Sequence, residues 1–423
     1  MKIAILGYGA EGRAALKFLK TSHRFKKATF KILDQKISKN YLKNLRAFDF
    51  VVRSPGVPYR LKEVQNAIRA GVRFSSVTKL FFEFCPGKII GITGSKGKGT
   101  ACTLLHKILK AAKKDAYLAG NIGASPLPLL RKIKKQSIVI LELSSFQLQD
   151  LEKSPTIAVV LDVFPEHLDH HKNMAEYVEA KSNIAAHQTR NDAVFYFSDN
   201  SLSSKIARRS PGRKITITGE PHGLKKNIVM AAAIASFLGV PHGLIAKTIK
   251  TFRGLPHRLE LVRTIKIKTL GQHTNKLENV GMLFYNDSFG TNPHTLAAAI
   301  RHFDKPNSAT IVIAGGRGKG LSYAPAGEAA KKSKSLKLAV LIGEDKEKIK
   351  KALGGAVKTL YTASLEDAVK KAYAAAKKLI NRLTDQPTTV NIVLAPGATS
   401  FDMFKSYKER GEKFKAIVKK LKA

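Results

Sequence analysis

The segment Lys88–Thr100 places a strand pattern, a glycine-rich turn and a helix pattern in direct succession. Ile89–Ile92 is almost wholly β-branched, glycines follow at 94, 97 and 99, and apolar residues recur at helical spacing through Ala101–Leu109. Glycines let successive backbone N–H groups converge on an anion, and the positive end of the following helix points at the same place. We therefore expect a phosphate-binding loop, in which Lys98 supplies a cation.

This loop departs from the general phosphate-loop pattern G-x-x-x-x-G-K-[ST] at two positions. The pattern requires glycine at position 92 and a hydroxyl at position 99, where the chain has Ile92 and Gly99. The nearest hydroxyl belongs to Thr100, one residue later. A glycine turn that merely ends a strand is the alternative, but G-x-G-K-G-T between strand and helix patterns favours a triphosphate site.

Composition bounds the class of protein. At 423 residues, 44% of them hydrophobic, the chain is long enough for two to four globular domains. Cys85 and Cys102 are too few for a disulfide framework, so we expect ordinary packing residues in a reducing cytoplasm. No apolar run reaches the roughly 18 residues of a membrane span. Met1–Leu6 is a short strand pattern rather than a leader, and we expect no membrane insertion.

The net charge of +43 comes from 74 Lys and Arg against 31 Asp and Glu. Such a field attracts polyanions, so a basic ATPase stimulated by nucleic acid is one alternative. The basic residues are spread through all regions, however, and no aromatic-interleaved or recognition-helix pattern stands out. We therefore expect phosphate-rich substrates rather than a nucleic-acid partner.

Strand and helix patterns alternate throughout the chain, which predicts an α/β fold of mainly parallel sheets flanked by helices. Gly7-x-Gly9-x-x-Gly12 follows the first strand pattern, and Asp34 lies at the end of the next, Thr29–Leu33, which is the spacing of an acid that contacts a ribose in a Rossmann unit. The second region opens with the phosphate loop. The third has strand patterns such as Ala309–Ala314 and a last helix pattern over Phe401–Leu421. We expect three domains: a Rossmann-like one at 1–87, a phosphate-loop ATPase at 88–262 and a Rossmann-like one at 263–423.

Further polar groups follow the loop. Glu142 in isolation is typical of a solvated acid. At a strand end beside a phosphate loop, however, a carboxylate holds magnesium between β- and γ-phosphates, and this context favours a ligand. The cluster Glu166–His171 suits either a metal site or polar surface, and its spacing does not decide between them. Lys181, on a predicted helix over Met174–Ala186, reads in isolation as a solvated charge.

Together these residues resemble the Mur ligases of peptidoglycan synthesis over essentially the whole chain, and within that family the members that add glutamate. The resemblance rests on these segments: Gly91–Lys98, Ala119–Gly123, Glu142–Leu148, His167–Asp169 with Tyr177 and Lys181, Gly254–Arg258, Asn286–Ser288 with Thr291 and Asn292, Gly315 and Gly316 with Lys319, and Ser400–Gly411. The strings Glu-Leu-Ser-Ser-Phe-Gln-Leu and Ser-Phe-Asp-x-Phe-Lys…Arg-Gly are the ones specific to glutamate addition.

The resemblance implies an ATP-dependent, amide-forming ligase. It would join glutamate, as the D enantiomer, to UDP-N-acetylmuramoyl-L-alanine through an acyl phosphate, for cell-wall synthesis and hence cell shape and division. The implied cofactors are ATP, two Mg²⁺ ions and a Lys181 carbamylated by CO₂. The implied enzyme is a cytoplasmic monomer.

The resemblance also implies residue roles. The implied catalytic residues are Lys98, Glu142, His167 and Lys181, and the implied Mg²⁺ ligands are Thr100, Glu142, His167 and Lys181. ATP would be bound by Gly94, Ser95, Lys96, Gly97, Lys98, Gly99, Thr100, Asn227, Arg258 and Asp287. The UDP-sugar would be bound by Gly7, Gly9, Gly12, Asp34, Ser54, Gly56 and Asn121, and glutamate by Thr291, Lys319, Ser400 and Tyr407.

Some positions depart from the family pattern. Gly99 replaces the hydroxyl residue after the loop lysine, Phe289 stands where related ligases often carry lysine, Gly223 and Leu224 replace a His-Asn pair, and Arg317 replaces an acid. The alternatives within reach are a sibling ligase for another amino acid, a folate polyglutamylating enzyme, which would lack the N-terminal UDP-binding domain, and an inactive scaffold. Retention of Lys98, Glu142, His167 and Lys181 argues against loss of activity.

Overall fold

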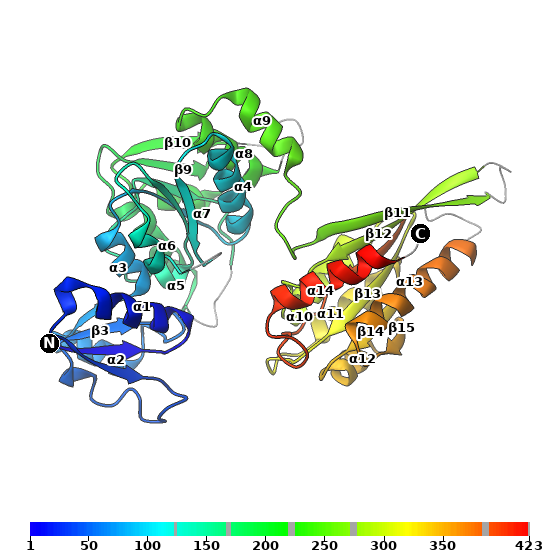
Figure 1. Ribbon diagram of the computed structural model, residues 1–423, viewed down its shortest axis with the longest axis horizontal. Coiled ribbons are helices and arrows are strands. Elements are labelled where there is room, and N and C mark those ends of the chain that lie inside the picture. The colour runs from blue at the N-terminus through cyan, green and yellow to red at the C-terminus, as the bar shows by residue number, and fades with distance from the viewer. Residues whose placement is uncertain (122–124, 166–170, 219–224, 271–276, 383–388, 422–423) are drawn as a thin grey trace. The chain divides into compact units, whose positions relative to one another are not determined.

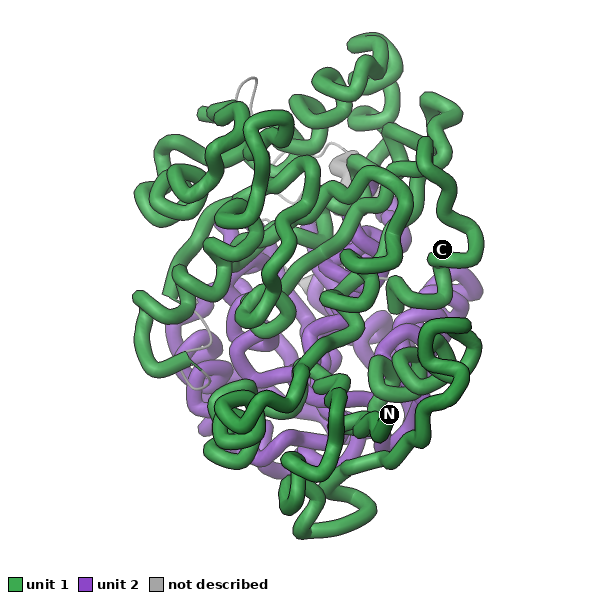
Figure 2. The backbone as a smooth tube through the Cα atoms, turned by 90° about the vertical axis from the view of Figure 1, so that its left-hand side faces the viewer, with its two compact units in different colours: residues 1–252 green, residues 253–423 purple. Residues whose placement is uncertain are grey.

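A computed structural model describes residues 1–121, 125–165, 171–218, 225–270, 277–382 and 389–421. The chain divides into two compact units, residues 1–252 and 253–423, which are coloured separately in Figure 2. Figure 1 labels the helices and strands.

The first unit begins with a parallel sheet of four strands. Their order is β2 (Thr29–Leu33), β1 (Lys2–Leu6), β3 (Phe50–Arg53) and β4 (Arg73–Ser75). Its helices are α1 (Ala10–Thr21), η1 (His23–Phe25), η2 (Leu45–Ala47), α2 (Lys62–Arg69) and α3 (Val77–Phe84). Successive side chains of β1 point to opposite faces. Ile3 and Ile5 therefore enter the core shared with α1 and α3, and Ala4 and Leu6 the core shared with α2.

The same unit contains a second parallel sheet, of six strands. Their order is β10 (Arg213–Ile217), β9 (Ala193–Phe197), β8 (Ile157–Val160), β5 (Lys88–Thr93), β7 (Ile138–Glu142) and β6 (Ala116–Gly120). Its helices are α4 (Lys98–Ala111), η3 (Leu127–Arg131), α5 (Ser145–Leu148), α6 (Met174–Ala186), α7 (Ser201–Ala207), α8 (Lys226–Phe237) and α9 (His242–Thr251). Ile90 and Ile92 of β5 share a core with α4 and α8, whereas Ile89 belongs to the core that also contains residues of the first sheet.

The second unit is built on one six-stranded sheet. The order is β11 (Glu260–Leu270), β12 (Leu277–Asn286), β16 (Thr389–Leu394), β13 (Ser308–Gly315), β14 (Leu336–Ile342) and β15 (Lys358–Tyr361). All neighbours are parallel except β11 and β12. Helices α10 (Pro293–His302), α11 (Ala324–Lys332) and α12 (Lys346–Leu353) share a core with one face, and α13 (Leu365–Arg382) and α14 (Tyr407–Lys420) with the other.

The predicted α/β class with mainly parallel sheets is confirmed, and two details of the prediction are wrong. The last helix was expected over Phe401–Leu421 but begins at Tyr407, because the Ser406 side chain caps it and the preceding residues turn back onto the Ser400 carbonyl. The antiparallel β11–β12 pair was not expected.

The expected domain limits are not settled by this division. The limit after residue 87 coincides with the start of β5, whereas the limit after residue 262 falls inside β11. The three-domain division therefore stays a prediction. Among the helices of the described segments, none has the length and apolar character needed to span a membrane.

Candidate active site

The loop between β5 and α4 has the geometry of an anion cradle. Gly94 and Gly97 have φ of 146° and 86°, a region that glycine adopts without strain. A Cβ at Gly97 would lie 2.1 Å from Asn227 Nδ2, and one at Gly94 would lie 2.7 Å from Leu161 Cβ. Glycine at both positions is therefore a steric requirement. Asn227, expected at the ATP site, lies directly against the loop.

Lys98 is the first residue of α4, and its side chain turns back across the loop. Its Nζ donates to the carbonyl oxygens of Gly94 (2.8 Å) and Ser95 (2.9 Å). Thr100 lies in the same first turn and is half-buried. Gly99, between them, is buried. The positive end of α4 and the Lys98 cation thus face the same loop.

Lys181 is buried beside this loop rather than solvated. It lies on α6 with 1% of its surface exposed, and its Nζ donates to Gly94 O (3.0 Å) and Thr93 Oγ1 (3.3 Å). The same nitrogen lies 4.6 Å from the centroid of the Tyr177 ring. The interpretation of Lys181 in isolation as a solvated charge is therefore wrong, because α6 packs over the end of β5.

Glu142 ends β7, the strand next to β5, and is 7% exposed. In register it pairs with Ile92, near the start of the loop. Its Oε1 accepts a hydrogen bond from Asn121 Nδ2 at 3.0 Å. A Cβ at Gly120 would lie 2.3 Å from the backbone carbonyl oxygen of Glu142, so a glycine is needed where β6 passes the main chain of β7. The carboxyl ends of β5, β6 and β7 thus gather the loop, Glu142 and Asn121 at one edge of the sheet.

Part of the expected metal set lies outside the described residues. His167 falls there, as do Gly223 and Leu224. Within the described segments, no three His, Cys, Asp or Glu side chains cluster closely enough to hold an ion. His171, from the same sequence cluster as His167, is 2% exposed, pairs with Ser145 Oγ at 2.9 Å and stacks on Phe146. It is therefore a packed core residue.

Residues expected around the UDP group gather at the carboxyl end of the first sheet. Ser54 Oγ donates to Gly7 O at 2.7 Å, and a Cβ at Gly12 would lie 2.1 Å from that same carbonyl oxygen. The Asp34 carboxylate accepts from Tyr8 N (2.6 Å) and Lys36 N (2.8 Å), and the first of these bonds does most to lower the pKa of Asp34. At Gly9 and Gly56 a Cβ would meet nothing within 4 Å.

A cavity of about 390 Å³ joins the first sheet to the Glu142 edge of the second, and we call it the substrate cavity. Expected residues Gly56 and Asn121 line it, together with Ser144 and Gln147 of the Glu142–Leu148 segment. The sequence had given no role to two further lining residues, Glu11 and Arg53. Burial raises the pKa of Glu11, and Gln147 Nε2 donates to its carboxylate at 3.4 Å.

Arg53 is 2% exposed. Its guanidinium donates to Val57 O (2.7 Å) and to Asp150 Oδ1 (3.4 Å), and lies 5.2 Å from the Tyr59 ring centroid. The only sequence signal for it is a charged residue at the end of a strand pattern. Its acidic partner is almost a hundred positions away, and only the fold brings the two together.

In the second unit, Asp287 follows β12 and is 7% exposed. Its Oδ1 accepts from Leu259 N at 3.1 Å, and burial raises its pKa to about 6. Arg258, expected with it at the ATP site, lies 5.6 Å from the centroid of the Phe289 ring. The structure therefore puts these two residues in one cluster, in a different unit from the phosphate loop.

Residues expected to hold glutamate lie around a buried arginine. Arg410 of α14 is 1% exposed and donates to Ser288 Oγ (3.0 Å) and to the carbonyls of Ala398 and Thr399. Ser288 Oγ in turn donates to Tyr407 O at 2.8 Å. The Tyr407 ring meets Phe289 edge-on at 5.3 Å. Burial lowers the pKa of Arg410 to about 10.

The four expected glutamate residues are not all brought together by hydrogen bonds. Ser400 is buried beside this arginine's carbonyl partners, and Tyr407 starts α14. Thr291 precedes α10 and is half-buried, and Lys319 is exposed in the segment after Gly315 and Gly316. Within the described part of the chain, neither of these two side chains bonds to the Ser288–Arg410 cluster. Arg317, one of the departures, pairs with Glu344 at 2.6 Å.

Comparison with known proteins decides the family. Residues 92–273 match the Mur ligase middle domain and residues 274–381 the Mur ligase, glutamate ligase domain. The chain is 34% identical to a UDP-N-acetylmuramoylalanine–D-glutamate ligase of Acetivibrio thermocellus, in an alignment that covers 100% of the chain and 97% of the relative. This chain belongs to the Mur ligase family. A ligase of the same name from Ruminiclostridium cellulolyticum is 29% identical over 100% of the chain and 97% of its own length.

Solved structures with low sequence identity share the fold. UDP-N-acetylmuramate–alanine ligase MurC from Thermotoga maritima matches with a TM-score of 0.53 and 14% identity, over 99% of both chains. E. coli FolC, solved in complex with DHPP and ADP, matches with a TM-score of 0.54 and 16% identity, over 81% of this chain and 92% of its own. The resemblance to Mur ligases expected from the sequence is thus confirmed, and the chain is a member of a family of ATP-dependent, amide-forming ligases.

Proposed function

We propose that this Mur ligase joins D-glutamate to UDP-N-acetylmuramoyl-L-alanine at the expense of ATP, as a step of peptidoglycan precursor synthesis. The observation that carries the proposal is full-length similarity, at 34% identity, to a ligase named for that reaction. The clustering of Lys98, Glu142 and Lys181 at one sheet edge also supports the proposal on chemical grounds. The enzyme works as a monomer in the cytoplasm and serves cell-wall growth, and through it cell shape and division.

ATP is bound through its phosphates by the loop Gly94–Thr100. The left-handed glycines and the α4 N-terminus offer backbone N–H donors, and Lys98 offers a cation. Asn227 borders the loop at Gly97. Arg258 and Asp287 are the residues we assign to ATP from the second unit.

The residues at this edge fit Mg²⁺. Mg²⁺ is usually held by one or two carboxylates together with substrate phosphates rather than by a full cage of protein ligands. Glu142 supplies such a carboxylate within reach of the loop, and Thr100 the hydroxyl that position 99 lacks. We assign His167 to the same set. Bound Mg²⁺ neutralises charge on the transferring phosphoryl group.

Conversion of Lys181 to a carbamate suits its surroundings. Lys98 and Lys181 both donate to the carbonyl oxygen of Gly94, so two ammonium groups are held close together. Like charges at such a distance repel, most strongly where water is excluded. The Lys181 ammonium group first loses a proton. Its nitrogen then forms a bond to the carbon of CO₂ and loses a second proton, so that a carbamate replaces one cation and removes the repulsion. The carbamate would also offer an oxygen ligand for a second Mg²⁺.

The reaction has two steps. A carboxylate oxygen of the alanyl group attacks the γ-phosphorus of ATP, and the bond from this phosphorus to the β–γ bridging oxygen breaks. ADP is the leaving group, and the product is an acyl phosphate. The amine nitrogen of glutamate then attacks the acyl carbon, and the tetrahedral intermediate loses phosphate and a proton to give the amide. Lys98 and the loop N–H groups stabilise the negative charge that moves to the leaving oxygen. The substrate cavity, which opens at Asn121 beside Glu142, holds the UDP-sugar.

Thr291, Lys319, Ser400 and Tyr407 hold the glutamate. Its two carboxylates need a cation and hydroxyl donors, which these side chains offer. Phe289, at the position where related ligases often carry lysine, is 48% exposed and contacts the ring of Tyr407.

ADP release measured with purified protein tests the proposal. We expect release that requires UDP-N-acetylmuramoyl-L-alanine and D-glutamate together, and that fails with L-glutamate. Release with another amino acid would indicate a sibling ligase. Release that needs neither substrate, or that DNA or RNA stimulates, would contradict the proposal and favour the alternative suggested by the charge of +43.

A further inference from the structure

A second cavity, of about 590 Å³, lies outside the candidate active site, between α1 and η3. We call it the α1–η3 cavity. Helix α1 contributes Glu11 of its first turn to the substrate cavity, but it contributes Ala14, Lys17, Phe18 and Thr21 of its later turns to this one. The opposite wall is η3, the 3-10 helix over Leu127–Arg131. None of the roles assigned above uses a residue that lines it.

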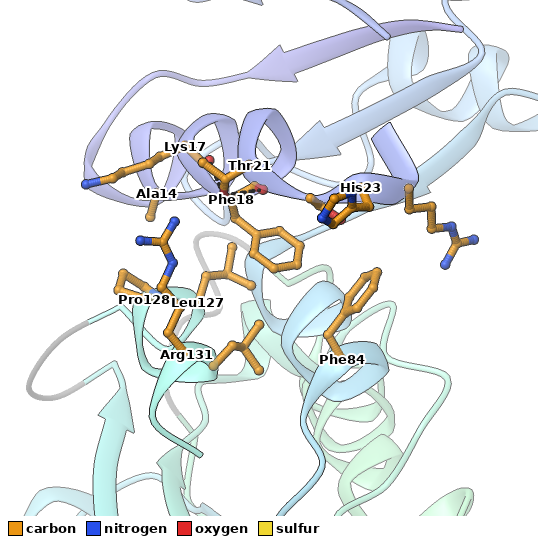
Figure 3. Close-up of a pocket in the computed structure, with 12 residues that line it drawn as sticks. Ala14, Lys17, Phe18, Thr21, His23, Phe84, Leu127, Pro128 and Arg131 are labelled. Atoms are coloured by element: carbon orange, nitrogen blue, oxygen red, sulfur yellow. Dashed lines mark hydrogen bonds between the residues drawn. The ribbon is translucent and has the colours of Figure 1, made fainter. Parts of the chain in front are cut away.

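The floor of the α1–η3 cavity is apolar. The rings of Phe18 and Phe84 meet edge-on with centroids 5.2 Å apart, and Leu127 below them is 1% exposed. Figure 3 shows Phe18 of α1 reaching down toward Phe84 and Leu127, with an open space framed by these three side chains. An apolar floor of this kind buries the apolar surface of a ligand away from water.

The charge around this floor has one sign. Lys17 and Arg131 stand on one side of the cavity, where Arg131 extends from η3 toward α1 (Figure 3). None of the described residues that line the cavity is acidic. Arg24, which also lines the cavity, is paired with Glu83. Within the described segments no carboxylate pairs with Lys17 or Arg131, so their charge is not neutralised by the fold.

We propose that the α1–η3 cavity binds a small amphipathic organic anion. Its apolar body rests on Phe18, Phe84 and Leu127, and its carboxylate, sulfonate or phosphate group pairs with Lys17 and Arg131. The volume lies in the range of small-molecule sites and is too small for a folded partner. An inorganic anion would leave the apolar floor unused, and an uncharged aromatic would leave both cations unpaired.

Two fluorescent probes of nearly the same shape test the proposal with the full chain. One is 8-anilinonaphthalene-1-sulfonate, an aromatic anion, and the other is N-phenyl-1-naphthylamine, its uncharged analogue. We expect saturable binding of the anion, weakened about tenfold by Lys17→Glu or Arg131→Glu, since each removes one charge-assisted contact. The same substitutions should change the affinity of the uncharged probe by less than about twofold. Ala14→Phe, which fills the cavity, should abolish tight binding of both.

Matched variants separate this site from general attraction to a chain of net charge +43. Lys20→Glu and Lys132→Glu make the same change in net charge at exposed neighbours that do not line the cavity. If these weaken the anion as much as Lys17→Glu and Arg131→Glu do, or if Ala14→Phe folds and binds the anion unchanged, the proposal is wrong. Far-UV circular dichroism establishes that each variant is folded. The surface variants keep the test decisive even if Ala14→Phe does not fold.

Discussion

At the scale of single residues, the centre of the site is one carbonyl oxygen shared by two lysines. Gly94 O accepts from Lys98 Nζ at 2.8 Å and from Lys181 Nζ at 3.0 Å. Lys98 is half-buried, and Lys181 is 1% exposed. Repulsion between like charges is strongest where water is excluded. Because Lys181 is the more buried of the two lysines, it is the one that we assign to carbamylation.

Lys181→Ala should lower the rate of ADP release about a hundredfold or more, because the proposed carbamate no longer contributes charge at the transferring phosphoryl group. Added acetate or formate should restore part of the rate, since a small carboxylate fits the space that the side chain leaves. The rate is measured with both substrates at saturation. Lys205→Ala, an exposed lysine on α7, is the control and should be unaffected. A folded Lys181→Ala enzyme with full activity, or one that no carboxylate rescues, would contradict the proposed role.

Asp287 predicts a pH dependence of stability with a definite sign. Its pKa is about 6 in the fold against 3.8 for an ordinary aspartate, and burial is the main cause. Between these values the folded state binds more protons than the unfolded state, so stability falls as pH rises through this window and stays lower above it. The shift corresponds to about 3 kcal/mol at most. Asp287→Asn, which carries no charge, should therefore be more stable than the natural chain at pH 7 and nearly equal to it at pH 4.

Thermal unfolding followed by circular dichroism at pH 4 and pH 7 measures this difference. Glu344→Gln in the same unit is the control of opposite sign, because a hydrogen bond from Arg317 lowers the pKa of Glu344. Identical pH profiles for Asp287→Asn and the natural chain would show that burial does not raise the pKa of Asp287. A gain in stability with a loss of activity would mean that the buried charge is kept for function.

At the scale of elements, the β5–loop–α4 unit depends on backbone shape more than on side chains. Gly97 and Gly239 share nearly the same left-handed conformation, with φ of 86° and 75°. A Cβ would strike Asn227 at Gly97 but meets nothing within 4 Å at Gly239. The two glycines therefore separate conformational strain from steric block.

Gly97→Ala should weaken ATP binding at least about tenfold, because the loop must move away from Asn227 and loses the alignment of its N–H donors. Gly239→Ala should cost about 1–2 kcal/mol of stability from the left-handed alanine and leave ATP affinity unchanged. Isothermal titration with ATP and Mg²⁺ measures the affinity of both variants. Equal losses in both variants would mean that strain, and not the contact with Asn227, decides the effect.

Elements whose signal is local could be predicted from the sequence, and those set by tertiary contacts could not. The strand Thr29–Leu33 and the helix Met174–Ala186 have the predicted bounds. The start of α14 was missed because a single cap, Ser406, ends the preceding turn inside an otherwise helical pattern. The β11–β12 pair was missed because alternation of strand and helix patterns elsewhere favoured parallel neighbours.

The site follows the same division. The glycine loop with Lys98 was predicted from its position between a strand pattern and a helix pattern, and Glu142 from its position at a strand end in the context of that loop. The burial of Lys181 depends on how α6 packs over β5, so the residues by themselves suggested the wrong environment. Glu11 and Arg53 were missed because their partners, Gln147 and Asp150, are far away along the chain.

At the scale of the whole molecule, the junction between the first two sheets of residues 1–252 contains both ion pairs and the cavity that we propose for the UDP-sugar. Among the described residues, three ion pairs cross it: Arg53–Asp150, Arg60–Glu176 and Lys79–Glu152. Arg53–Asp150, at 3.4 Å, is buried, with side chains 2% and 5% exposed, and Lys79–Glu152, at 3.0 Å, is open, with side chains 17% and 78% exposed. Arg53 also lines the substrate cavity. Arg53–Asp150 and Lys79–Glu152 thus allow a buried and a solvent-exposed pair to be compared across one junction.

Arg53→Met should destabilise the first unit by about 3–5 kcal/mol, because Asp150 is left as a buried charge without a cation. The second substitution in Arg53→Met/Asp150→Leu removes that charge and should restore most of the stability. Lys79→Met, across the same junction, should cost less than about 1 kcal/mol, since its pair is solvent-exposed. Urea unfolding followed by circular dichroism gives the three values.

The folded double variant also tests the role of Arg53 in substrate binding. Its KM for the UDP-sugar should rise while its KM for ATP stays the same, because Arg53 lines the substrate cavity and not the phosphate loop. An unchanged KM for the UDP-sugar would limit Arg53 to joining the two sheets.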